Sequence, residues 1–153
     1  MMADFESRDA QLRARLLAID GSTHGEEQLK CDVVLRTPSL LAPFPFLVSN
    51  EWEPIPGWPQ GGKGDLVFTD GGGRYAVVEV KWMAPLYSGP SQKKRRNKKR
   101  GKVKSQAKIY AMHVLQVCTD ALEVRMMTYT NDPQRPGLHD LGALARASTA
   151  DAV

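Results

Sequence analysis

The sequence has little cysteine and no apolar run long enough to span a bilayer. Its two cysteines, Cys31 and Cys118, lie far apart and form no CxxC or Cys/His cluster, which argues against a zinc module and a disulfide framework. We expect both to be small buried hydrophobic residues. The N-terminus carries Asp4, Glu6 and Asp9, unlike a secretory or transit peptide. We therefore expect an intracellular protein without a membrane partner.

Acidic residues are missing from one stretch, residues 93–104, which contains nine lysines and arginines. The 153-residue chain has 21 basic and 17 acidic residues and a formal net charge of +4. The remainder therefore has 12 basic and 17 acidic residues, a net charge of −5. The length suits one domain, and shares of 42% hydrophobic and 25% charged residues are typical of globular proteins. Collagen-like, disulfide-rich and wholly disordered classes are excluded.

Periodicity and turn signals predict a mixture of helices and strands. In chain order we expect helices over residues 3–19 and 24–36, strands over 46–52, 65–70 and 74–82, a loop over 83–101, a helix over 102–118 and a strand over 122–130. The three glycines at 71–73 predict a hairpin between the second and third strands. The expected fold class is α/β, with a central mixed β-sheet of about four strands that includes this hairpin and is flanked by helices.

We expect one domain over residues 1–130 and a flexible C-terminal tail over residues 131–153, where prolines, a glycine and small residues accumulate. The basic segment at 91–104 is expected to be a solvated loop, inserted between the hairpin and the following helix. Nine like charges would repel one another if they were packed together.

The strand over 74–82 carries two charged residues in an otherwise apolar run. Glu79 and Lys81 are two residues apart and therefore share one face, whereas Val78 and Val80 face the other way. Charges inside such a strand are costly unless they are paired or bind a ligand. Two interpretations remain open, a half-exposed face in solvent or a functional site. Asp65, at the start of the preceding strand, is the nearest partner for such a site in the hairpin.

The helix expected over 102–118 adds Gln106 and Tyr110, which lie four residues apart on one helical face. Together, Gly64-Asp65, Glu79-Val80-Lys81 and Gln106-x-x-x-Tyr110 resemble the PD-(D/E)XK nuclease superfamily, and the last element resembles its RecB-like and Cas4-like branch. The matching residues cover roughly a third of the chain. Gly64 replaces the proline of the superfamily's name, and the basic insertion before the helix is a second departure.

This resemblance implies a restriction endonuclease-like core and a site that binds Mg²⁺ or Mn²⁺. Phosphodiester hydrolysis needs charge stabilisation and a nucleophilic water, and a hard cation with oxygen ligands supplies both. By resemblance, the metal ligands are Asp65, Glu79 and the backbone carbonyl of Val80. Lys81 would lie beside the attacking water. Gln106 and Tyr110 would border the site.

The superfamily often adds an acid from further upstream. Glu51 and Glu53 are the nearest candidates, with Glu53 marginally preferred, and Glu26 and Glu27 are more remote ones. The alternative for each is an ordinary surface carboxylate.

The basic segment lies between the Glu-x-Lys strand and the Gln-x-x-x-Tyr helix. Its lysines and arginines are expected to contact nucleic-acid phosphates, with DNA preferred over RNA. These residues are Lys93, Lys94, Arg95, Arg96, Lys98, Lys99, Arg100, Lys102 and Lys104. A nuclear-import signal is the alternative, compatible with phosphate contact, so the protein is expected in the nucleus if the chain is eukaryotic and otherwise in the cytoplasm.

The resulting hypothesis is a metal-dependent nuclease that hydrolyses phosphodiester bonds in DNA, acting as a homodimer or as one subunit of a larger complex. Two alternatives remain. One is a catalytically inactive nucleic-acid-binding module of the same fold. The other is a nuclear adaptor protein, in which the basic segment is only an import signal.

Overall fold

The computed structural model describes residues 2–18, 25–50, 66–83 and 90–147. Its helices and strands, in chain order, are α1 (Met2–Ala18), α2 (Glu26–Leu35), α3 (Thr37–Leu40), β1 (Phe46–Asn50), β2 (Leu66–Thr69), β3 (Arg74–Lys81), α4 (Pro90–Val117), β4 (Glu123–Thr130) and β5 (Gly137–Ala145). The expected α/β class is confirmed. No helix of the described ranges combines the length and apolar character that crossing a membrane requires.

The strands form one mixed five-stranded sheet in the order β1-β2-β3-β4-β5. Neighbouring strands are antiparallel except for β3 and β4, which are parallel and are joined through α4. The expected hairpin is present between β2 and β3. Its turn is closed by the Asp70 carboxylate, which accepts hydrogen bonds from the backbone N–H groups of Gly72 and Arg74 at 2.7 and 3.1 Å. Gly73 has a φ of 103°, a conformation that favours glycine.

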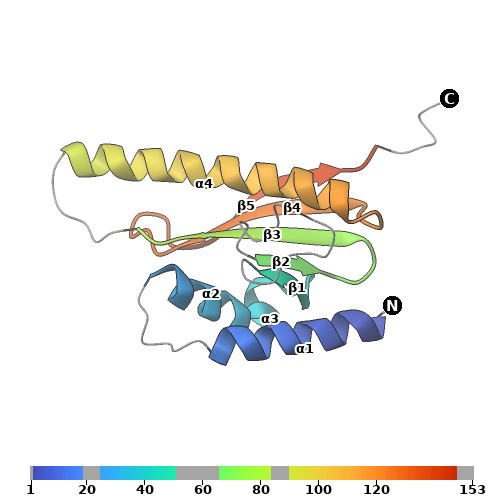
Figure 1. Cartoon of the computed structure of the whole chain (residues 1–153). Coiled ribbons are helices and arrows are strands. Elements are labelled where there is room, and N and C mark those ends of the chain that lie inside the picture. Colours follow the sequence, from blue (N-terminus) through green and yellow to red (C-terminus); the bar gives the residue numbers. More distant parts are fainter. Residues whose placement is uncertain (1, 19–24, 51–65, 84–89, 148–153) are drawn as a thin grey trace.

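The sheet is covered on both faces: α1, α2 and α3 lie on one face, and α4 lies across the other (Figure 1). Because side chains alternate along a strand, β3 contributes to two cores. Ala76 and Val78 belong to the core under α1–α3. Tyr75 and Val77 belong to the core under α4. The sheet therefore has an α1–α3 face and an α4 face.

The expected loop over the basic segment is wrong, because residues 90–104 form the first half of α4. Pro90 is suited to the first helical position, since its missing N–H would be unpaired there in any case. Lysine and arginine are also good helix formers, and the only glycine in this half, Gly101, costs about 1 kcal/mol. In Figure 1 the N-terminal turns of α4 reach beyond the ends of the strands.

The segment expected to be a flexible tail contains β5, the fifth strand, whereas we expected about four strands. It pairs with β4 from Thr130↔Gly137 to Glu123↔Ala145. The register shifts between Met126 and Met127, opposite Gly142, whose φ is 105°. This shift marks a β-bulge, and the prolines that suggested a tail lie in the turn before the strand.

Candidate functional site

Glu79 lies near the C-terminal end of β3 and is only 5% exposed. Strand alternation directs it to the α4 face, together with Val77. In the parallel register it is paired with Thr128 of β4. The solvent-exposed interpretation is therefore wrong for Glu79: it is a buried carboxylate, and burying such a group is costly without partners.

Lys81 lies two residues further along, where β3 ends, and it is partly exposed. Its ammonium Nζ is 3.3 Å from the Oε1 atom of Glu26, in the first turn of α2. α2 begins at this place because its N-cap residue, Gly25, has a φ of 104° and lies beside the ring of Trp82. Lys81 is therefore paired with Glu26, which the sequence analysis gave only as a more remote candidate for the additional acid of the site.

A second lysine–glutamate pair lies next to the first in α2. Lys30 is 1% exposed, and its Nζ is 3.8 Å from Oε1 of Glu27. Acidic side chains in the first turn of a helix are favoured by the helix dipole, so both glutamates suit this position. The first turn of α2 therefore provides two carboxylates that face lysines.

Asp65, Gly64, Glu51 and Glu53 lie outside the residues that the structure describes. The described part of β2 begins at the next residue, Leu66. It pairs with Val78, the residue before Glu79. In the sequence, Asp65 immediately precedes Leu66 and Glu79 immediately follows Val78, the two residues of this pair.

Gln106 and Tyr110 are half-buried residues of α4, the helix that covers the same sheet face as Glu79. Between and after them, Ala107 and Ala111 are fully buried against the sheet. Their small side chains allow close approach of helix and strands. Tyr110 packs against the core under α4, with its ring centroid 6.5 Å from that of His113.

The basic residues lie on the N-terminal half of α4. Lys94, Lys98, Lys102 and Lys104 are exposed. The side chains of Lys93, Arg95, Arg96, Lys99 and Arg100 lie outside the described part. Like charges three or four residues apart on a helix repel each other, and positive charge near a helix N-terminus opposes the helix dipole. Anions placed along this half of α4 would relieve both effects.

At the ends of β3 and β4, the side chain of Asn131 continues the hydrogen bonding between the two strands. The Oδ1 atom of Asn131 accepts the N–H of Met83 at 2.6 Å, and its Nδ2 donates to the carbonyl of Met83 at 2.9 Å. These are the two bonds that a further strand residue would make. They fix the point where the chain leaves β3, close to Lys81.

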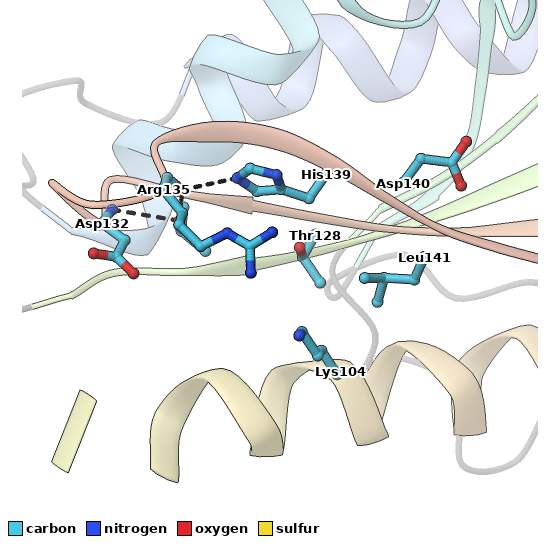
Figure 2. A pocket seen from close by; sticks show the side chains of 8 residues that line it. Lys104, Thr128, Asp132, Arg135, His139, Asp140 and Leu141 are labelled. Carbon is cyan, nitrogen blue, oxygen red and sulfur yellow. Dashed lines mark hydrogen bonds between the residues drawn. The ribbon is translucent and has the colours of Figure 1, made fainter. Parts of the chain in front are cut away.

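Beside this strand end is a cavity of about 120 Å³ between α4 and the ends of β4 and β5 (Figure 2). Thr128 and Thr130 reach it from β4; in the register they pair with Glu79 and Lys81. The full lining is Lys104, Thr128, Thr130, Asp132, Arg135, His139, Asp140 and Leu141. Sequence reasoning singled out only Lys104 among these. The pairing of β4 with β5 and the turn between these two strands bring the others together, and no local spacing in the sequence signals this.

Away from this region, two groups at the opposite end of β3 have raised pKa values. The hydroxyl of Tyr75 donates to the two carboxylate oxygens of Asp120 at 3.0 and 2.9 Å, and burial together with this contact raises the pKa of Tyr75. Burial, and then Asp120, raise the pKa of Cys118 to about 11. In α2, on the other side of the sheet, burial and then Glu27 raise the pKa of Cys31. Both cysteines are free and half-buried.

The donors near the end of β3 are of the type that Mg²⁺ prefers. The carboxylate of Glu79 and the carbonyl of Val80 are hard oxygen donors. Among the described residues, however, no three His, Cys, Asp or Glu side chains are grouped to hold a metal ion. The residues therefore fit Mg²⁺ only if Asp65, or an upstream acid, joins Glu79.

The chain matches no protein-family model, no curated protein and no solved structure.

Proposed function

We propose that the chain is a metal-dependent nuclease that hydrolyses phosphodiester bonds in DNA, with Glu79 as its central residue. The observation that carries this proposal is the burial of the Glu79 carboxylate in an otherwise apolar strand, two residues before Lys81. Functional sites are places where a costly buried charge is retained. The parallel strands β3 and β4 both end here, and ligands of α/β proteins favour the carboxyl ends of such strands.

Each residue of the proposed site has a distinct role. Asp65, Glu79 and the carbonyl of Val80 would hold Mg²⁺ or Mn²⁺, with Glu53, Glu51 or, from its contact with Lys81, Glu26 as a further acid. When bound, the cation supplies charge stabilisation and an acidified water.

The side chains around the metal ligands would bind and orient the reactants. Lys81 would orient the attacking water and stabilise the charge that develops on the phosphate. Its pairing with Glu26 holds it at the strand end, near Glu79 along the chain. Gln106 and Tyr110, half-buried on α4, would border the phosphate on the side away from α2.

The DNA backbone would lie along the N-terminal half of α4. The four exposed lysines there support this arrangement, because phosphates would relieve their mutual repulsion. Lys104 also lines the cavity beside β4, at the end of the basic segment nearest to Gln106. We propose DNA rather than RNA as the substrate, and a homodimer or a larger complex as the working form.

The test is cleavage of labelled single-stranded, duplex and branched DNA and of matched RNA, with Mg²⁺, with Mn²⁺ and with chelator. We expect DNA cleavage that requires the metal and is lost in Glu79→Gln and Lys81→Ala. A matched control is Glu123→Gln, which changes a half-buried glutamate on the neighbouring strand and should leave the rate unchanged. If every substrate stays intact with either metal, the enzyme proposal fails.

A nucleic-acid-binding module without catalysis is the second candidate. The ion pair between Lys81 and Glu26 favours it, since a lysine held by a carboxylate needs no catalytic role. Calorimetry with Mn²⁺ separates the two functions. A nuclease site should release heat on metal binding that disappears in Asp65→Asn and Glu79→Gln. A binding module should show DNA affinity but no such heat.

The third candidate, a nuclear adaptor, predicts that the basic segment does not contact DNA. Replacing Lys94, Lys98 and Lys102 by alanine would then abolish import in a eukaryotic cell and leave DNA affinity unchanged. The nuclease and the binding module both predict a loss of DNA affinity in the same variant. Gel-shift titration at two salt concentrations distinguishes these outcomes.

A further inference from the structure

The cavity beside β4 contains two positive side chains without an acidic partner in the described part of the chain. Lys104 reaches it from α4, and Arg135 reaches it from the turn between β4 and β5 (Figure 2). Of the two lining acids, Asp140 is paired with Arg125 at 2.8 Å. Asp132 accepts the backbone N–H of Gln134 at 3.0 Å. The lining therefore contributes two cationic groups, Lys104 and Arg135, beside two carboxylates that are engaged with other residues.

Thr128 is the second, independent observation. It is 4% exposed, and in Figure 2 it lies between the β4 ribbon and Lys104, among the side chains that line the cavity. Its hydroxyl makes no hydrogen bond within the described residues, and burying an unpaired hydroxyl costs free energy. The hydroxyl of Thr130, two residues away, is by contrast bonded to the carbonyl of Arg135 and the N–H of Asp132, both at 3.3 Å.

The backbone of Arg135 is held in place from two sides. Its carbonyl accepts the hydrogen bond from Thr130 and lies 2.8 Å from Nε2 of His139. Its N–H donates to the carbonyl of Asp132 at 3.1 Å. The side chain of Arg135 therefore extends from an anchored stretch of backbone at the rim of the cavity.

From this arrangement we infer that the cavity is a binding subsite for one phosphate group of a nucleic acid. Lys104 and Arg135 supply charge, and Thr128 supplies a buried hydrogen-bond donor. The volume of about 120 Å³ exceeds the roughly 30 Å³ that one water occupies in the liquid. Thr128 pairs with Glu79, so the phosphate would be bound one strand away from the proposed active site. The inference deepens the proposed function and rests on it for the identity of the ligand.

The experiment measures binding in the full chain with chelator present, so that no cleavage occurs. The first probe is inorganic phosphate, titrated by calorimetry. Arg135→Ala and Thr128→Val should each weaken phosphate binding by about 10-fold or more, the effect of losing one hydrogen bond to a charged group. Thr128→Val should melt no lower than the parent without phosphate, because the hydroxyl it removes has no partner in the described structure.

Lys108→Ala is the matched control for Lys104→Ala. Both remove one exposed lysine of α4, but only Lys104 lines the cavity, and Lys108 lies outside the basic segment. Phosphate affinity should fall in Lys104→Ala and stay within twofold in Lys108→Ala. Equal losses would mean a diffuse charge effect and would overturn the subsite. Unchanged affinity in both Arg135→Ala and Thr128→Val would overturn it as well.

The second probe distinguishes the source of the phosphate. Three short oligodeoxynucleotides carry a 5′-phosphate, a 3′-phosphate or neither. A subsite for a terminal phosphate predicts that Arg135→Ala weakens one phosphorylated oligonucleotide most. A subsite for a backbone phosphate predicts equal weakening of all three. Since no metal is present, failure of metal-dependent cleavage would leave these results intact, and loss of the subsite would leave cleavage to be judged separately.

Discussion

The two faces of β3 differ in the polarity of their side chains. On the α1–α3 face the strand is apolar after its first residue, Arg74, and Ala76, Val78 and Val80 are all buried. On the α4 face it changes halfway, from the buried Val77 to the charged Glu79. The first face is used for packing alone. The second uses its N-terminal half for packing and keeps its C-terminal half polar.

β4 repeats this change in parallel with β3. Val124 is buried under α4, whereas Thr128 and Thr130, further along the same face, line the cavity. The polar region therefore spans two parallel strands at their carboxyl ends, under the same helix. This polar half of the α4 face is the region in which we propose the active site and the phosphate subsite.

The largest effect is expected on the α1–α3 face. Phe68 is fully buried in its core, so Phe68→Ala should lower the free energy of unfolding by about 3–5 kcal/mol. Urea denaturation measures this loss. Val67→Ala, its neighbour on the α4 face, should cost clearly less because fewer carbon atoms are removed. Equal losses would show that the α4 face is packed more tightly, because Val67→Ala removes fewer atoms for the same loss.

The second effect concerns the polar half of the α4 face. Glu79→Gln keeps the size of the side chain and should reduce metal-dependent DNA cleavage by at least about 100-fold. Its melting temperature should change little by comparison with Phe68→Ala. Cleavage rates at saturating Mg²⁺ together with thermal melts measure both quantities. A variant that cuts within threefold of the parent would assign Glu79 to structure only.

The third effect is expected from the exposed half of α4. Replacing Lys94, Lys98 and Lys102 by alanine should make the slope of log affinity against log salt shallower by about 2.7, if each lysine contacts one phosphate of duplex DNA. Arg15→Ala, an exposed residue on α1, should leave the slope unchanged. A similar change in both would mean that DNA does not distinguish the two sides of the molecule.

The fourth effect is a loss of folding stability at alkaline pH, which we expect from Cys118 and compare with Cys31. Burial raises the pKa of Cys118 to about 11, so its neutral thiol is favoured in the folded state. That stabilisation is complete below about pH 9 and is lost as the pH rises through 11. The fall in stability between pH 8 and pH 10.5 should be smaller in Cys118→Ala. A thiol reagent at pH 8 should label Cys118 more slowly than Cys31, whose pKa is raised less.

The smallest effect comes from Gly101, in the exposed half of α4. A Cβ atom added there would meet no other atom within 4 Å. Gly101→Ala should therefore stabilise the helix by up to about 1 kcal/mol through backbone propensity alone. Circular dichroism during thermal melting measures this gain. A loss instead would indicate that the glycine conformation itself is required.

The part of the fold that local pattern determines was predictable. The alternation along β3, the glycine turn before it and the helix after it follow from periods of two and 3.6 residues and from three adjacent glycines. The N-terminal half of α4 was missed because repulsion among its charges suggested a loop, whereas lysine and arginine are good helix formers. β5 was missed because the prolines before it are turn residues and its alternation is weak.

For the candidate site, the sequence identified Glu79 and Lys81 but not their neighbours. Glu26 and Lys81 are 55 residues apart in the sequence, and they form an ion pair because α2 packs beside the end of β3. Thr128 meets Glu79 only through the parallel register. Such contacts depend on tertiary pairing, for which one sequence carries no local signal.

The bulge in β5 also bears on how the chain avoids aggregation. β5 is an edge strand of nine residues, long enough to recruit another strand. At Gly142 its backbone departs from regular pairing, and the N–H of that residue is taken by the Asp140 carboxylate at 2.8 Å. A second copy approaching this edge would therefore meet an interrupted row of donors. Self-association by strand pairing along β5 is therefore disfavoured.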